Sequence, residues 1–360
     1  MAKNVVFLFC LFVLYACRQS PVRYSGDPVF PDTDTLQATL INADFIFDFP
    51  RQIALSDSLL VIRDVGAAIP GEPAYFHLFS DRGDYLGSFG RRGRGPGELL
   101  ESTTLTFDRN GTAYAYDPAS KKTVCYPLHD SLPCPFREFD MRQALPDSLV
   151  RQRYTRITDL LRIPAGDFLV IGNNDFLRFG IYTGQGSVRP IWNTYPQLTA
   201  MGTPAEVWSI FNSSAKYRLA PDGSKLACAT YVGAVLDCYS VDNDRMERIG
   251  TYRIYEPVYK IFEGVTPTQI TRTDRTVIGF EDLDVTNRYI YGLLNGCSQG
   301  AYAYPDRIVV FDWEGRPVRS YHVDMPLCKI AVDDKRGVIY ALTASEGEPC
   351  RLVRFDLPDE

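Results

Sequence analysis

The chain has 360 residues, a formal net charge of −6 at neutral pH, 45% hydrophobic residues and 23% charged residues. This length exceeds the usual size of one hydrophobic core, so we expect either two domains or one fold that repeats around an axis. The 22 Tyr and 21 Phe residues favour β-strands over helices. Nucleic-acid binding requires a clustered basic surface, and the acidic composition argues against one.

The first residues predict export and lipid attachment. Lys3 precedes an apolar run over residues 5–15, which is shorter than a bilayer span of about 20 residues and is typical of a signal peptide. The run ends in Leu-Tyr-Ala-Cys, which resembles the lipobox of bacterial lipoproteins. We therefore predict a lipoprotein signal peptide over residues 1–16, a palmitate-bearing anchor on Cys17 and a tether over residues 17–34. A plain signal peptide with an incidental cysteine is the alternative.

Turn signals then recur along the chain at nearly regular spacing. They centre on Asp57, Asn110, Gly166, Gly223, Asn287 and Lys335. Successive markers lie 48 to 64 residues apart, and each interval holds four short strand-like runs. Units of four strands with a period of about 40–50 residues are typical of β-propeller blades. The sequence therefore predicts an all-β, six-bladed β-propeller over residues 35–360.

Closure of the ring is a second prediction. The last unit holds only three strands, over residues 327–333, 338–343 and 351–357, whereas residues 35–40 form a spare strand at the other end of the chain. We expect this N-terminal strand to complete the last blade, because a closed ring leaves no open sheet edge at the seam.

The connections between strands sort into two faces. Turns that join strands one and two, or three and four, lie on one rim and are short, and we call this rim the short-turn face. The remaining connections lie on the opposite rim, the long-loop face. They cover residues 65–73, 90–101, 141–152, 193–213, 254–281 and 294–304. Long loops on a rigid scaffold usually carry specific contacts, so we expect function there. Neutral insertion on an idle surface is the alternative.

Two segments give the chain a family resemblance. Residues 87–98 read GSFGRRGRGPGE, and residues 105–117 read LTFDRNGTAYAYD, in which a four-residue turn separates two strands. With six blades and a lipobox, the chain resembles the TolB-like six-bladed propeller lipoproteins of Gram-negative envelopes and, more widely, the NHL-type propellers. The resemblance implies a fold and an envelope location, and it carries no agreed catalytic set.

The glycine-rich phrase supplies the first candidate binding residues. Arg91, Arg92, Arg94 and Glu98 lie in a segment that could present guanidinium groups and backbone N–H donors to an anionic ligand. The structural alternative is that Gly and Pro only let the chain cross from one blade to the next.

Polar residues at the ends of second strands are candidate channel-mouth groups. They are Asp64, Asp117, Asn173 and Asn174. Such oxygen ligands would suit a calcium ion, whereas the alternative is that each carboxylate caps its own turn. Beyond this ion we expect no cofactor or metal, because His77, His129 and His322 fall in places that do not converge. No G-x-S-x-G elbow is present either.

Aromatic residues crowd the long-loop face, and we take Trp208, Tyr302 and Tyr304 as contacts for a sugar ring or a protein partner. Packing in the core is the alternative. Residues 203–206 read TPAE, a capping pattern that predicts a short helix containing Trp208 and Phe211. A second short helix is expected over residues 145–154.

The cysteines leave two interpretations open. Cys228 and Cys238 flank one connection, and Cys125 and Cys134 flank another. Each pair is either a cross-strand disulfide or two buried thiols, and we favour thiols because direct cross-strand bridges are geometrically demanding.

Together these patterns favour a monomeric, non-enzymatic binding scaffold that recognises an envelope protein or glycan through its long-loop face. Arg18, directly after the predicted anchor, resembles lipoproteins that are sorted to the outer membrane. The sequence is compatible with either side of the outer membrane, the periplasmic side or the cell surface. The alternative function is a metal-dependent lyase or hydrolase that acts at the mouth of the propeller channel.

Overall fold

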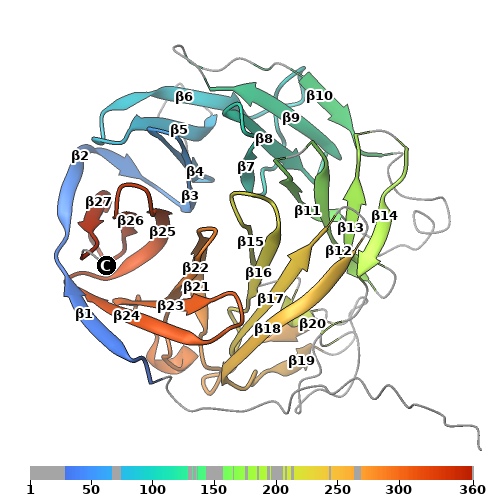
Figure 1. Cartoon of the computed structure of the whole chain (residues 1–360). Helices are drawn as coiled ribbons and strands as arrows, with labels where there is room; N and C mark the ends of the chain where they lie inside the picture. The colour runs from blue at the N-terminus through green and yellow to red at the C-terminus, as the bar shows by residue number, and fades with distance from the viewer. Residues whose placement is uncertain are drawn as a thin grey trace, which may run out of the picture.

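The computed structural model describes residues 29–358 except for 67–73, 129–131, 133–134, 136, 143–156, 165, 175–176, 185, 193–194, 196–205, 207–208, 212–214, 243–244 and 263–268. Its strands form six radial sheets around a central axis (Figure 1). The predicted six-bladed propeller is therefore confirmed. Among the described residues, no helix is long and apolar enough to cross a membrane.

Each blade is an antiparallel sheet whose first strand lies at the axis. Blade 1 contains β3 (Pro50–Ser56), β4 (Leu59–Asp64), β5 (Ala74–Ser80) and β6 (Tyr85–Arg91), and blade 2 contains β7 (Leu105–Phe107), β8 (Thr112–Asp117), β9 (Lys122–Pro127) and β10 (Arg137–Asp140). Blade 3 contains β11 (Ile157–Arg162), β12 (Phe168–Asn174), β13 (Leu177–Tyr182) and β14 (Arg189–Trp192), and blade 4 contains β15 (Lys216–Leu219), β16 (Lys225–Ala229), β17 (Ala234–Val241) and β18 (Met246–Tyr255). Blade 5 contains β21 (Phe280–Val285), β22 (Tyr289–Leu294), β23 (Arg307–Asp312) and β24 (Pro317–Val323), and blade 6 contains β25 (Leu327–Asp333), β26 (Val338–Thr343) and β27 (Cys350–Asp356).

The N-terminal segment closes the ring, in more detail than the sequence predicted. Strand β2 (Thr39–Phe47) pairs antiparallel with β27 and supplies the missing outer strand of blade 6. Strand β1 (Asp32–Leu36) instead pairs parallel with β24 as a fifth strand of blade 5. The expected strand over residues 35–40 is thus split: Leu40 joins blade 6, and Leu36 joins blade 5. The outer edges of β24 and β27 are therefore both covered by the N-terminal segment.

The hairpin over residues 105–117 forms as predicted, and its turn chemistry is local. The Asp108 carboxylate accepts backbone N–H bonds from Asn110 at 2.9 Å and Thr112 at 3.0 Å. Gly111 closes the turn with a bond to the Asp108 carbonyl, and its φ of 74° lies in the left-handed region that favours glycine.

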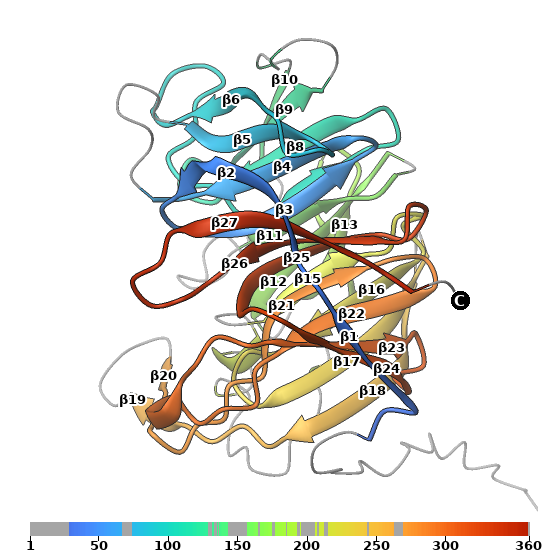
Figure 2. The ribbon, with the colours of Figure 1, turned by 90° about the vertical axis from the view of Figure 1, so that its left-hand side faces the viewer.

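The two faces differ as expected (Figure 2). The side that faces the viewer in Figure 1 lies at the right in Figure 2 and carries the short turns. The opposite side carries the long connections, including the hairpin of β19 (Lys260–Phe262) and β20 (Gln269–Thr271) and the 3-10 turn η1 (Gln299–Ala301). The predicted division into a short-turn face and a long-loop face is confirmed.

The core consists of apolar layers between neighbouring blades. Because side chains alternate along a strand, Val235 and Tyr239 of β17 pack toward blade 3, whereas Leu236 and Cys238 pack toward blade 5. Cys228 lies in the first of these layers. A disulfide between Cys228 and Cys238 would have to cross the sheet, so that alternative is wrong. Both are buried thiols.

The other expectations from the sequence are partly visible. Cys125 is also a buried free thiol, whereas its suggested partner, Cys134, lies outside the described residues. Glu206 and residues 209–211 are helical, as the capping pattern predicted, and Phe211 is fully buried. The second expected helix, over residues 145–154, lies outside the described residues.

Closure predicts a measurable stability effect. Phe47, in the closing strand β2, is 3% exposed and packs on Phe79 at 5.7 Å between ring centroids. Phe47→Ala should lower the free energy of unfolding by about 3–5 kcal/mol, because it leaves a cavity at the seam. Urea denaturation of the purified protein measures this. Phe49→Ala is the matched control, since Phe49 is 50% exposed. Equal losses from the two variants would contradict the closure.

Candidate functional site

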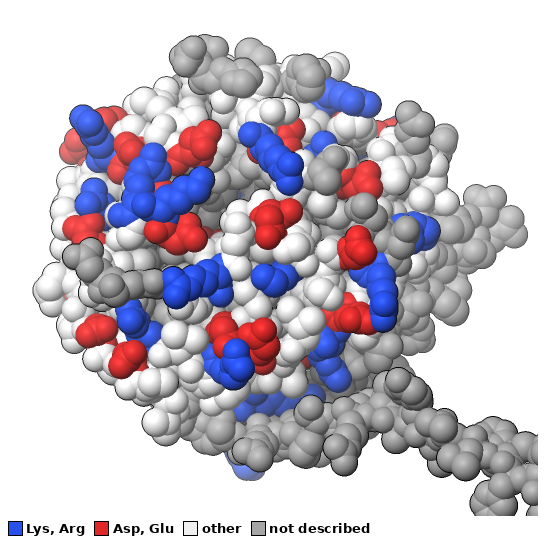
Figure 3. All heavy atoms as spheres, in the orientation of Figure 1, with Lys and Arg blue, Asp and Glu red and all other residues white. Residues whose placement is uncertain are grey.

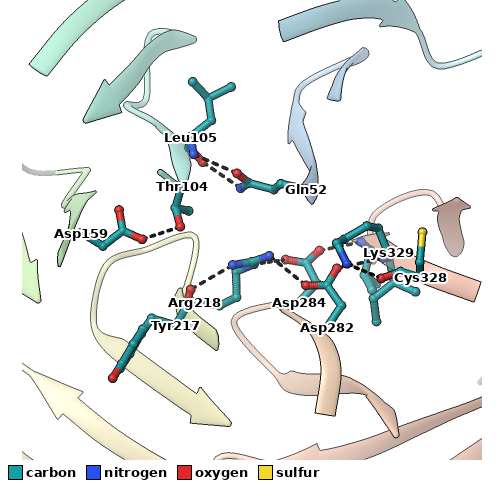
Figure 4. Close-up of polar contacts among 12 residues, drawn as sticks. Gln52, Thr104, Leu105, Asp159, Tyr217, Arg218, Asp282, Asp284, Cys328 and Lys329 are labelled. Atoms are coloured by element: carbon teal, nitrogen blue, oxygen red, sulfur yellow. Dashed lines mark hydrogen bonds and ion pairs between the residues drawn. The ribbon is translucent and has the colours of Figure 1, made fainter. Parts of the chain in front are cut away.

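The central channel opens on the short-turn face as a cavity of about 390 Å³. Residues of all six innermost strands line it, so it lies on the propeller axis. Figure 3 shows this face, where acidic and basic side chains lie next to one another without a large patch of one sign. Gln52, Thr104, Arg218 and Asp284 line the cavity and belong to a layer of polar contacts between the blades (Figure 4). We call this layer the polar belt.

Blades 1, 2 and 3 are joined by the first half of the polar belt. The Gln52 side-chain amide donates to the Leu105 carbonyl at 2.9 Å and accepts from the Leu105 N–H at 2.8 Å. It therefore completes a backbone ladder between β3 and β7. The Thr104 hydroxyl donates to the Asp159 carboxylate at 2.5 Å, which links blade 2 to blade 3. Burial raises the pKa of Asp159, and this hydrogen bond opposes the rise.

Blades 4, 5 and 6 are joined by an ionic cluster. The Arg218 guanidinium lies 3.2 Å from the Asp282 carboxylate and 3.9 Å from that of Asp284. The same two carboxylates accept the backbone N–H groups of Ile330 at 3.1 Å and Val332 at 2.7 Å in blade 6. Burial raises the pKa of Asp284 to about 7, and Arg218 opposes the rise. The cluster connects three blades through one arginine and two carboxylates.

Further cations lie toward the long-loop end of the axis. Lys216 is the first residue of β15, Lys329 lies near the start of β25, and Arg63 lies near the end of β4. The Lys329 ammonium donates to the Cys328 carbonyl at 2.6 Å, and the Arg63 guanidinium donates to the Ser102 carbonyl at 2.5 Å. We call Lys216, Lys329 and Arg63 the cationic group.

An exposed aromatic pair lies on the same face. Tyr302 and Tyr304 are 36% and 43% exposed, and their rings meet edge to face with centroids 5.4 Å apart. The Tyr302 hydroxyl donates to the Glu281 carboxylate at 2.7 Å. Since Glu281 belongs to the innermost strand β21, this bond positions the pair next to the channel. Burial, together with this hydrogen bond, raises the pKa of Tyr302, so the phenol stays neutral.

The candidates in the glycine-rich phrase have mixed roles. The Arg92 guanidinium donates to the Gly66 carbonyl at 2.7 Å and stacks on Tyr75, so it holds the neighbouring loop. The Glu98 carboxylate accepts the N–H of Gly95 at 2.8 Å and turns back on its own segment. Arg91 and Arg94 are exposed. These contacts favour the structural interpretation for Arg92 and Glu98 and leave the other two arginines accessible.

The predicted channel-mouth carboxylates cap local backbone. Asp64 is buried and accepts the N–H groups of Asp48, Phe49 and Gly66. Asp117 is also buried and accepts those of Leu100, Ala119 and Ser120. Neither lines the cavity on the short-turn face. The capping alternative is therefore the better description of both residues.

The remaining sequence candidates are only partly visible. Asn173 and Asn174 lie in β12, and their side chains are outside the described part of the structure, as is Trp208. His77 is buried and hydrogen-bonds Ser88 through its ring at 2.8 Å. Among the described residues, no group of three or more His, Cys, Asp or Glu is placed to hold a metal ion. A calcium ion in the channel stays a prediction, and it would face the repulsion of the cationic group.

Sequence reasoning missed the polar belt and the cationic group. A signal was present: charged residues alternate with apolar ones in innermost strands, as in Lys216-Tyr217-Arg218 of β15 and Asp282-Leu283-Asp284 of β21. In a propeller, alternate positions of innermost strands face the neighbouring blades and the channel. Opposite charges in corresponding strands of consecutive blades therefore predict an ionic contact at the axis.

The sequence matches the family model described as TolB-like 6-blade propeller-like over residues 29–335. The chain belongs to this family. Among solved structures, a Bacteroides fragilis protein assigned as exported shares 11% identity and a TM-score of 0.54 with this chain, and the match covers 91% of this chain and 99% of that chain. A DUF4221 family member from Bacteroides vulgatus shares 11% identity and a TM-score of 0.51, with 90% and 98% covered.

At 11% identity, both structures support the fold of this TolB-like propeller. Its function has to be inferred from its own residues. No curated protein matches the chain in sequence.

The ionic cluster predicts that Arg218→Met lowers the free energy of unfolding by about 3–5 kcal/mol, because it leaves the buried Asp282 carboxylate without its cation. Chemical denaturation measures the loss. Arg316→Met is the control: Arg316 pairs with Asp312, but its side chain is 72% exposed, so solvent screens the pair and the stability should hardly change. Similar values for the two variants would show that the cluster does not hold the blades together.

Proposed function

We propose that this TolB-like propeller is an exported, lipid-anchored binding protein that holds an envelope glycan against its long-loop face. The observation that carries the proposal is the exposed Tyr302–Tyr304 pair, fixed by Glu281 at the channel. Tyrosine rings with an apolar face and a polar edge suit the alternating surfaces of a sugar ring. An envelope protein is the other partner class that such a surface would suit.

The topology supports the choice of face. Strand β24 starts after the short turn at Gly315 and runs toward the long-loop face. Because β1 is parallel to β24, its first residue, Asp32, lies on the short-turn side (Figure 2). A lipid anchor on Cys17 would therefore connect to the propeller on the short-turn side, at the opposite end from the long-loop face.

A binding role also agrees with the contacts of the polar belt, whose side chains join neighbouring blades. Gln52, Asp159, Arg218, Asp282 and Asp284 all make contacts that join neighbouring blades. A catalytic group must be free to exchange protons or bind a reacting atom. These side chains are committed to structure, so the metal-dependent lyase or hydrolase is the weaker proposal.

The anchor is tested by metabolic labelling with a palmitate analogue. Wild-type protein should be labelled and should sediment with membranes, whereas Cys17→Ala should lose both properties, because the acylated thiol is gone. Cys10→Ala is the control, since Cys10 lies inside the apolar run. Label that persists in Cys17→Ala would overturn the anchor.

The binding surface is tested with purified protein on an array of envelope glycans. Tyr304→Ala should weaken binding about 3- to 10-fold, because one ring–ring or ring–sugar contact is removed. Tyr85→Ala is the matched control, since Tyr85 is 39% exposed on the outer strand β6. Equal binding by wild type and Tyr304→Ala would sink the proposed surface, and capture of a protein in place of a glycan would redirect it.

A further inference from the structure

We infer that the cationic group, Lys216, Lys329 and Arg63, forms an anion site at the long-loop end of the channel that receives the carboxylate or phosphoryl group of the bound glycan. This inference deepens the proposed function and rests on it for the glycan itself. The site is distinct from the arginines of the glycine-rich phrase, because its members come from β4, β15 and β25.

The first step concerns the groups that the three cationic side chains contact. Lys329 and Arg63 donate to the neutral carbonyl groups of Cys328 and Ser102, and no ion pair within the described residues holds either side chain, although the nearby Asp159 favours the charge of Arg63. Nε of Arg63 is buried without a hydrogen-bond partner. The Lys216 side chain makes no hydrogen bond or ion pair with the residues that the structure describes, although its backbone pairs with Ala229 in β16. Three cations with unused donors therefore lie at one end of the axis.

The second step is that the nearby carboxylates are already engaged. Asp282 and Asp284 bind Arg218 and the backbone of blade 6, and Asp159 accepts the Thr104 hydroxyl. Glu281 accepts the Tyr302 hydroxyl. Each of these carboxylates therefore already accepts a fixed hydrogen bond or ion pair. An external anion would supply the direct contact that the Lys216 side chain lacks.

The third step is the electrostatic state of Lys216. Burial, helped by the nearby charges of Lys329 and Arg218 and opposed by those of Asp282 and Glu281, lowers the pKa of Lys216 to about 8. Lys216 is partly exposed although it lies on an innermost strand with a blade on either side. A bound anion would favour the charged ammonium, and Lys216 would favour the anion in return.

The fourth step joins this site to the tyrosine pair. Glu281 touches Tyr302 and is next to Asp282 in β21, and its charge acts on Lys216. The aromatic pair and the cationic group therefore flank the same end of the channel. A sugar ring that stacks on Tyr304 can direct an acidic substituent toward the axis. An acidic sugar would contact both the tyrosine pair and the cationic group, whereas a neutral sugar would contact only the tyrosine pair.

Calorimetry and thermal unfolding of the purified full chain test the site with three probes: sodium glucuronate, inorganic phosphate and glucose. Glucuronate or phosphate should bind saturably and raise the unfolding temperature above that in sodium chloride of equal ionic strength, and glucose should not. A response to glucuronate alone identifies a carboxylate ligand, and a response to phosphate alone identifies a phosphoryl ligand. No response to either anion overturns the site.

Lys216→Met should weaken anion binding about 10-fold or more, because one charged hydrogen-bond donor is lost. Lys335→Met is the control, since Lys335 is exposed at the short-turn mouth of the channel. Binding by wild type should weaken as the pH rises through about 8, where Lys216 loses its charge. Unchanged anion binding by a folded Lys216→Met variant overturns the site.

If Lys216→Met does not fold, the site is tested instead by nuclear magnetic resonance of the wild-type protein with dimethylated lysines, which follows the titration of each lysine. One lysine signal should titrate near pH 8 and move to higher pH when the anion is added; the absence of any such shift overturns the site. Failure of the proposed function has a different signature: phosphate binds at Lys216, but no glycan binds and Tyr304→Ala has no effect.

Discussion

The contact between Arg218 and the carboxylates of Asp282 and Asp284 is the constraint on which the rest of the structure depends. A propeller must hold its blades in a ring although each blade is a separate sheet. The apolar layers between the blades bury area without specifying height along the axis. Directional hydrogen bonds and ion pairs at the axis supply that register, and one arginine supplies it for three blades at once.

Charged residues along the channel have two different roles, one in joining the blades and one in the proposed binding site. The carboxylates in the middle of the axis are engaged in blade-to-blade contacts, whereas the Lys329 ammonium toward the long-loop end donates to a backbone carbonyl. The proposed anion site therefore lies at the long-loop mouth of the channel. Tyr302 and Tyr304 lie at that mouth, and the chain enters the propeller at Asp32 on the opposite face. The start of β1 and the tyrosine pair thus lie at opposite ends of the axis.

The fold could be predicted from local signals, because turns such as Asp108-Arg109-Asn110-Gly111 repeat at blade spacing and each depends on neighbouring residues. Closure was also predictable from the strand count, but the split of residues 35–40 between two blades was not, since it depends on the parallel pairing of β1 with β24. The site was harder. Asp64 and Asp117 ended strands where ligands could lie, yet their oxygens cap backbone. Lys216 and Lys329 are 113 positions apart in sequence, so only the ring brings them together.

The central claim is that the partner binds at the long-loop mouth. Site-specific photo-crosslinking in intact cells tests it most directly, with a photoreactive residue placed at Tyr304 or, as the comparison, at the exposed Arg82 in a turn of the short-turn face. The account predicts a discrete adduct from position 304 and none from position 82. An adduct from position 82 alone, or from neither position, would contradict it.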